Sequence, residues 1–101
     1  MNERIQNALK RIACNVPRHM LNIERRFDDV AVRLVKTDDG HAGALQQVAS
    51  GIETFKTWCE QTTIPLDGAQ LEAMATTLER NADALDELLY TLEEYCTQQG
   101  Q

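Results

Sequence analysis

The chain has 101 residues, a net charge of −6 and a hydrophobic fraction of 43%. This composition is typical of one folded domain and excludes an intrinsically disordered chain. No apolar run approaches the roughly 20 residues that a membrane-spanning helix needs, and the N-terminus lacks the basic and apolar segments of a signal peptide. We therefore expect a cytoplasmic protein with no membrane-embedded part.

The three cysteines, Cys14, Cys59 and Cys96, lie far apart in the chain. Their number is odd, so they cannot all pair within one chain, and their spacing is not that of metal ligands. We interpret them as reduced residues in or beside the core of a cytoplasmic protein. A redox role or an intermolecular disulfide is the alternative.

The first third of the chain predicts helices on both sides of Pro17, at about residues 3–15 and 17–36. The phase of the apolar residues is continuous across the proline, so Pro17 either kinks one long helix or separates two. Proline lacks a backbone donor and disfavours a helical conformation in the residue before it. We favour a break near Asn15, which would cap the second helix with Pro17 in its first turn.

A third helix is predicted at about residues 42–61, after a loop in which Asp38, Asp39 and Gly40 supply the turn residues. Gly51 lies inside this helix and costs about 1 kcal/mol of helix stability relative to alanine. We interpret it as a place where another helix approaches closely. Pro65 prevents the helix from continuing into the next segment.

The chain is organised around its last predicted helix, at about residues 68–98, for which Asp67 is the expected N-cap. Its apolar residues alternate in steps of three and four, as at the a and d positions of a heptad. The a and d positions are Leu71, Met74, Leu78, Asn81, Leu85, Leu88, Leu92 and Tyr95. The e positions are also apolar, and the b positions are all acidic. Asn81 interrupts the apolar register. It could fix the register or the number of helices in the bundle, which we favour, or it could form a hydrogen bond to an outside partner.

These elements predict an all-α protein with a single domain over residues 1–101. We expect a small bundle of three to four antiparallel helices with a long heptad-patterned C-terminal helix. The last helix is half as long again as the two before it, so its last turns would project as an uncovered apolar tail. Such a tail normally contacts a second chain. The predicted tail residues are Leu88, Leu89, Leu92, Tyr95 and Cys96.

Charge is distributed unevenly along the chain. Residues 1–36 hold eight Lys and Arg against four Asp and Glu, a charge of +4, and the other residues hold two cations against twelve carboxylates, a charge of −10. Three interpretations are open. The basic first helices could lie against the acidic last helix, within one chain or between subunits. The acidic b column could instead bind a basic surface of another protein as a phosphate-mimicking decoy; its residues are Glu72, Glu79, Asp86 and Glu93. Four arginines could instead contact nucleic acid; they are Arg18, Arg25, Arg26 and Arg33.

Residues that would indicate catalysis are scarce. The sequence has no phosphate-binding glycine loop and no paired-histidine metal motif, and Ser50 is its only serine. We interpret His41 as a solvated loop residue and His19 as a packing or surface residue. We therefore expect no enzyme activity, no metal and no cofactor.

Two aromatic residues at the edge of or opposite the apolar stripes, Trp58 and Tyr90, are the first choices for partner contact, since tyrosine and tryptophan are enriched at binding hot spots. Together these patterns favour a non-catalytic adaptor, chaperone or inhibitor that binds and occludes a larger protein, with a homodimer also expected. The alternative is a nucleic-acid-associated protein that uses the basic N-terminal helices.

Overall fold

The computed structural model describes residues 3–35, 42–64 and 67–99, which are nearly all helical and contain no strand. The elements are α1 (Glu3–Lys10), a π-helical turn η1 (Arg11–Asn15), α2 (Val16–Val35), α3 (Ala42–Gln61) and α4 (Gly68–Gln99). The prediction of an all-α protein is confirmed. The predicted loop at residues 36–41, with His41, and the predicted stop at Pro65 lie outside the described residues.

Pro17 does not break the helix, so the predicted break near Asn15 is wrong. The helix runs from Glu3 to Val35 and widens into the π turn immediately before the proline. There the N–H of Val16 bonds the carbonyl of Arg11, five residues back. In a regular α-helix the proline ring would collide with the carbonyl four residues earlier, and the wider turn relieves this collision. The π turn therefore explains how one helix continues through Pro17.

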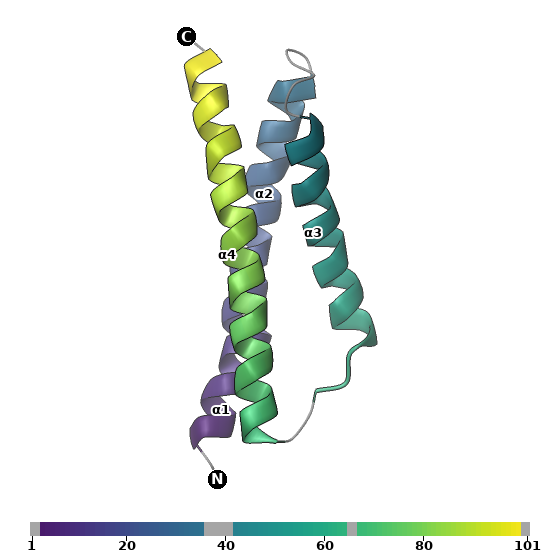
Figure 1. Ribbon diagram of the computed structural model, residues 1–101, viewed down its shortest axis with the longest axis vertical. Coiled ribbons are helices and arrows are strands. Elements are labelled where there is room, and N and C mark those ends of the chain that lie inside the picture. The colour runs from purple at the N-terminus through teal and green to yellow at the C-terminus, as the bar shows by residue number, and fades with distance from the viewer. Residues whose placement is uncertain (1–2, 36–41, 65–66, 100–101) are drawn as a thin grey trace.

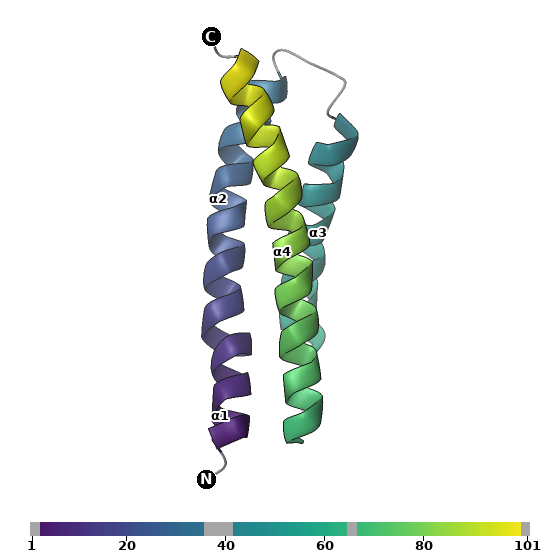
Figure 2. The same ribbon diagram turned by 60° about the vertical axis from the view of Figure 1, so that its left-hand side comes forward.

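The three helical rods form a bundle about 54 Å long. The α1–α2 rod and α4 run side by side in the same direction, and α3 runs in the opposite direction (Figures 1 and 2). The parallel order is also evident from the contacts, because Arg4 bonds Glu72, Arg11 bonds Glu79 and Arg26 bonds Glu93. The α1–α2 rod and α4 are thus parallel neighbours, and only α3 is antiparallel to them. The expectation of an antiparallel bundle did not state which helices would be neighbours.

The fully buried stripe of α4 is not the predicted one. The prediction placed the a and d columns in the core, whereas the buried residues of α4 lie at the a and e positions. The most buried members of this stripe are Leu71, Ala75, Ala82, Leu89 and Leu92. They pack against Ala8, Ile12, Ile23, Val30 and Leu34 of the α1–α2 rod. The d column, Met74, Asn81, Leu88 and Tyr95, is left partly or fully exposed. The a and e columns therefore form the centre of the core, and Met74, Leu88 and Tyr95 of the d column pack against its edge.

The predicted apolar overhang does not exist. Leu89, Leu92 and Cys96 are buried, while Leu88 and Tyr95 are half-buried. The cause is the continuous helix through Pro17, because a rod from Glu3 to Val35 matches the 32 residues of α4 and covers it to its end (Figure 2). The tail therefore gives no reason to require a second chain at this end of the bundle.

The predicted start of α4 is confirmed. The carboxylate of Asp67 accepts hydrogen bonds from the backbone N–H groups of Ala69, at 2.8 Å, and Gln70, at 3.1 Å. These bonds satisfy two of the free donors at the helix N-terminus. The cap fixes the register in which α4 enters the bundle.

Candidate functional site

One side of α4 is joined to the α1–α2 rod by a ladder of ion pairs. The carboxylates are the acidic b column, spaced every seven residues. Arg4 lies 2.5 Å from Glu72, and Arg11 bonds Glu79 through two nitrogens at 2.6 and 2.9 Å. Arg26 bonds Glu93 in the same bidentate way, at 2.7 and 3.0 Å. The interpretation that the basic first helices lie against the acidic last helix is confirmed.

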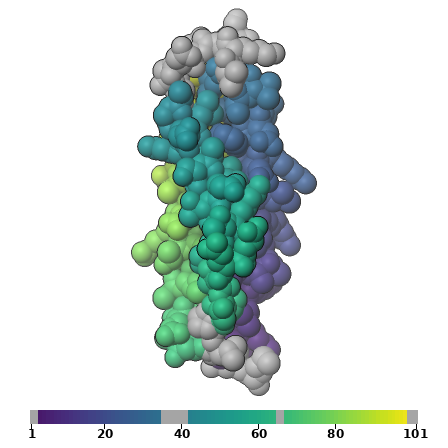
Figure 3. Space-filling view, turned by 90° about the vertical axis from the view of Figure 1, so that its right-hand side faces the viewer, coloured from purple at the N-terminus to yellow at the C-terminus, as the bar shows by residue number. Residues whose placement is uncertain are grey.

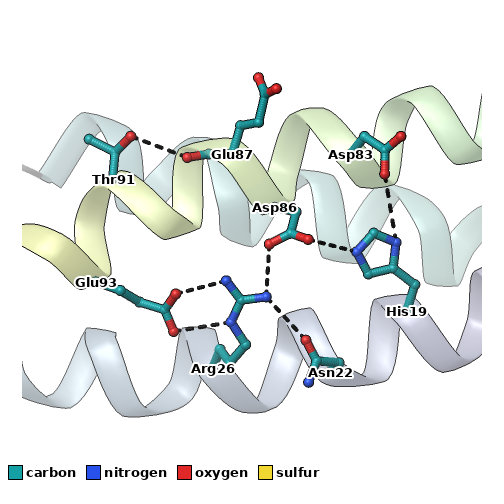
Figure 4. A network of polar contacts seen from close by, with 8 residues as sticks. All are labelled: His19, Asn22, Arg26, Asp83, Asp86, Glu87, Thr91 and Glu93. Carbon is teal, nitrogen blue, oxygen red and sulfur yellow. Dashed lines mark hydrogen bonds and ion pairs between the residues drawn. The ribbon is translucent and has the colours of Figure 1, made fainter.

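The π turn decides which basic residues join this ladder. Arg4, Arg11, Arg18 and Arg25 follow a strict seven-residue spacing. The π turn places one extra residue between Arg11 and the next contact, so the ladder continues with His19 and Arg26 in place of Arg18 and Arg25. His19 Nε2 lies 2.9 Å from Asp86, and Arg26 reaches the other oxygen of Asp86 at 2.8 Å (Figure 4). The extra residue turns Arg18 and Arg25 outward, where both are exposed.

The ladder favours the charged form of two of its carboxylates, Glu79 and Asp86. The hydrogen bond from Arg11 keeps the pKa of Glu79 below its ordinary value. Burial by itself would raise the pKa of Asp86, but the hydrogen bonds from His19 and Arg26 outweigh it, and that pKa is also lowered. Hydrogen bonds to Glu93 and Asp86 raise the pKa of Arg26. These groups therefore stabilise the contact between α2 and α4 as ions.

These contacts correct two predicted sites. The b-column carboxylates are not a free acidic surface, because each one has a basic partner on the first rod. The four arginines do not form one band for phosphates, because Arg26 is engaged in the ladder and Arg33 lies 3.5 Å from Asp29. Of these four arginines, only Arg18 and Arg25 are exposed without an ion pair to another described residue.

The other side of α4 faces α3 and carries no charge. Together the two helices present what we call the α3–α4 face, formed by Gln47, Ser50, Thr54 and Trp58 of α3 and by Asn81 and Ala84 of α4. Most of these side chains are exposed, and Trp58 is half-buried. Because 26% of the residues in the chain are charged, a two-helix face without any charge is unusual here.

A groove of about 440 Å³ runs along this face between α3 and α4. Met20, Phe55, Leu78 and Leu85 supply its apolar lining, and Trp58 borders it. Figure 3 looks onto α3, with α4 on its left and α2 on its right, so that the groove lies along the left flank of α3. The C-terminal end of α3 stands away from α4 (Figure 1), and there Trp58 stacks on Phe55 at a centroid distance of 6.2 Å.

Gly51 allows Leu85 to reach into the contact between the two helices. A Cβ atom at position 51 would lie 2.6 Å from a terminal methyl of Leu85, closer than real contacts allow. The prediction that this glycine permits a close approach is confirmed. Leu85 is the one a-position leucine of α4 that is not fully buried, and it forms part of the groove wall.

The remaining predicted residues fall in separate places. Tyr90 is 58% exposed on the acidic outer surface of α4, where its hydrogen bond to Glu94 raises its pKa. It is therefore not part of the groove. Cys96 is buried in the core, whereas Cys14 and Cys59 are exposed. The expectation of a thiol in or beside the core thus fits Cys96 and is wrong for the exposed Cys14 and Cys59.

Four further residues line the groove: Ser50, Thr54, Asn81 and Ala84. For Asn81 the sequence left open a bond to an outside partner as the less favoured alternative, whereas the other three are small or neutral and are not predicted as site residues. For Asn81 and Ala84, the signal in the sequence is the absence of charge from the d and g columns of α4 along its whole length. No comparable pattern marks Ser50 and Thr54 of α3.

Among the described residues, no group of three His, Cys, Asp or Glu side chains could hold a metal ion, and none of the helices is long and apolar enough to cross a membrane. No protein-family model, curated protein or solved structure was found to match this chain. The α3–α4 face is therefore assessed from its geometry and chemistry alone.

Proposed function

We propose that this protein is a non-catalytic interaction module that binds another protein through the α3–α4 face. The observation that carries the proposal is the charge-free surface around a groove bordered by the only tryptophan of the chain. The centres of protein–protein interfaces are depleted of charged residues and enriched in aromatic residues and methionine. Trp58, Phe55 and Met20 at this groove fit that composition.

The shape of the groove suggests what kind of segment enters it. It lies between two helices whose neighbouring side chains are small or uncharged, such as Gly51, Ser50 and Ala84. Such a groove suits an amphipathic helix that inserts its apolar residues at three- and four-residue spacing. A charged side chain inserted there would lose water without gaining an ionic partner. Binding of this kind serves an adaptor, a chaperone or an inhibitor that occludes its target.

The acidic-decoy mechanism is not part of this proposal, because the b-column carboxylates already have partners within the chain. The nucleic-acid alternative has no observation in its favour, because its arginine band is divided between the two sides of α2. A cytoplasmic location is part of this proposal, and three cysteines without a disulfide in the chain support it.

The test compares two lysine substitutions on exposed helix surfaces. Ala84→Lys puts a charge at the groove, whereas Val32→Lys puts the same charge on α2, at a side chain that is 61% exposed. Both variants and the unchanged protein would be used for cross-linking in the cells that produce the protein naturally. We expect specific partners to be retained by the unchanged protein and by Val32→Lys and lost by Ala84→Lys. If Ala84→Lys is folded and retains every partner, the proposal is wrong.

A further inference from the structure

We propose that the α3–α4 face is occupied by a second copy of this chain, which packs its own α4 antiparallel against the exposed seam of the first. This inference rests on the proposed function, because it names a partner for the same face. It shares only Leu88 and Tyr95 with the predicted apolar tail, and both are half-buried, whereas Leu89, Leu92 and Cys96 are buried within one chain.

The first argument is that α4 carries two heptad seams. The a and e positions form the seam buried inside the bundle, whereas the d and g positions form a second seam that is exposed or half-buried. Met74, Leu88 and Tyr95 of this second seam also pack against the edge of the core, and Asn81 and Ala84 line the groove. Spacings of four and three alternate along this second seam without interruption, as in helices that pack on a partner helix. Its members are Gln70, Met74, Thr77, Asn81, Ala84, Leu88, Thr91 and Tyr95, all uncharged.

The second argument is that the seam is self-complementary. Its spacing is the same in both directions about the middle of α4, between residues 82 and 83. A two-fold axis at that point makes each seam position face a seam position of the other copy, as an isologous dimer requires. A larger side chain then always meets a smaller or polar one. The pairs are Asn81 with Ala84, Leu88 with Thr77, Met74 with Thr91 and Tyr95 with Gln70.

The third argument is charge complementarity beside the seam. Arg80 and Glu87 are exposed c-column residues, and neither side chain has an ion pair among the described residues. Figure 4 shows Glu87 pointing away from the His19–Arg26 network. In the two-fold arrangement, Arg80 of one copy and Glu87 of the other lie at nearly the same height along the helix axis. They are offset by about two residues, or roughly 3 Å. Because like flanks face each other in an antiparallel helix pair, two symmetric Arg80–Glu87 pairs would form.

The groove supplies the fourth argument. Asn81 and Ala84, at the centre of the seam, also line the groove beside Trp58. A second α4 centred there lies over the groove and removes Trp58 from water, and residues near the centre of an interface contribute most to binding. The two copies would form a four-helix arrangement from α3 and α4 of each. A different protein would then bind this face by displacing the second copy.

The decisive measurement is the solution mass of the reduced protein by light scattering on serial dilution, with Trp58 fluorescence recorded in parallel. We expect a dimer whose dissociation is accompanied by a red shift of the Trp58 emission. Ala84→Lys should raise the dimer dissociation constant by about tenfold or more, whereas Val32→Lys should leave it unchanged. A protein that remains monomeric at every concentration would overturn the inference.

The orientation is tested by exchanging the two flanking charges. Arg80→Glu and Glu87→Arg each place like charges opposite one another, so each should weaken the dimer about threefold or more. The double variant restores opposite charges and should dimerise as the unchanged protein does. If the single variants have no effect, or if the double variant is as weak as the single ones, the antiparallel seam is not the interface.

The inference and the proposed function can fail separately. A monomer whose cross-linked partners are nevertheless lost in Ala84→Lys overturns the second copy and leaves the proposed function standing. If Ala84→Lys weakens the dimer but the cross-linked partners are retained, the dimer proposal is supported. The proposal that other proteins bind at this face is then wrong.

Discussion

The two sides of α4 differ in what they contact. The side toward α2 carries a carboxylate on every heptad, and each carboxylate is paired with a basic residue of the same chain. The side toward α3 carries no charge and borders an open groove. The charged column looked more like a binding surface in the sequence, yet it holds the bundle together. On this helix, the absence of charge marks the surface that we propose as the contact with another chain.

The largest effect should come from removing apolar volume on the α2 side of α4. Leu89 is completely buried there, so Leu89→Ala should lower the free energy of unfolding by about 2–5 kcal/mol. Leu88, its neighbour in the chain, is half-buried on the α3 side, so Leu88→Ala should cost clearly less. Urea unfolding followed by circular dichroism measures both. Equal losses for the two variants would show that the a and e columns do not form the core.

The next effect tests the register that the π turn imposes. Arg26→Ala leaves Asp86 and Glu93 without their arginine and should lower the free energy of unfolding by about 1–2 kcal/mol. Arg25→Ala removes an exposed side chain with no ion pair among the described residues and should change stability by less than about 0.5 kcal/mol. The reverse order in urea unfolding would mean that the strict heptad is followed through Pro17.

This pair of arginines also shows how far the sequence could predict the structure. The helix limits and the Asp67 cap were predictable, because capping, turn and proline signals are local. The effect of Pro17 was not predictable, because a helix break and a wider turn both accommodate a residue that has no backbone N–H to donate. The wider turn shifts the residues that contact α4 by one position, from Arg18 and Arg25 to His19 and Arg26. With a break at Pro17, the first rod would be much shorter than α4, and this is why an uncovered apolar tail was predicted.

The candidate site was predictable only in part. Trp58 was chosen because of its residue type, and it does border the groove. The rest of the face depends on which apolar columns of α4 turn inward, and a helix with apolar a, d and e columns leaves that choice open. The decision is made by packing, because the buried a and e columns meet the first rod, while Gly51 admits Leu85 beside α3. No local signal carries that information.

A smaller effect should appear with pH, and only on the ion-paired side. The pKa values of Glu79 and Asp86 are lowered in the folded protein, so the unfolded chain takes up these protons first as pH falls. Their stabilisation is complete above the unfolded pKa and is lost as pH falls through the folded one, below about pH 4. Glu79→Gln should be less stable at neutral pH and lose less on acidification. If Glu79→Gln loses as much unfolding free energy on acidification as the unchanged protein does, the ion pair of Glu79 does not contribute to stability.

The smallest effect should come from the helix contact at the groove. Gly51→Ala gains about 1 kcal/mol of helix propensity, but its new methyl group would meet the end of the Leu85 side chain. Because Leu85 borders an open groove, it can turn into that space instead of straining the backbone. We therefore expect the free energy of unfolding to change by less than about 1 kcal/mol, while the displaced Leu85 narrows the groove and alters the Trp58 emission. A loss well above that value would show that α3 and α4 are packed as tightly as α2 and α4. The contrast between an open and a closed side of α4 would then be wrong.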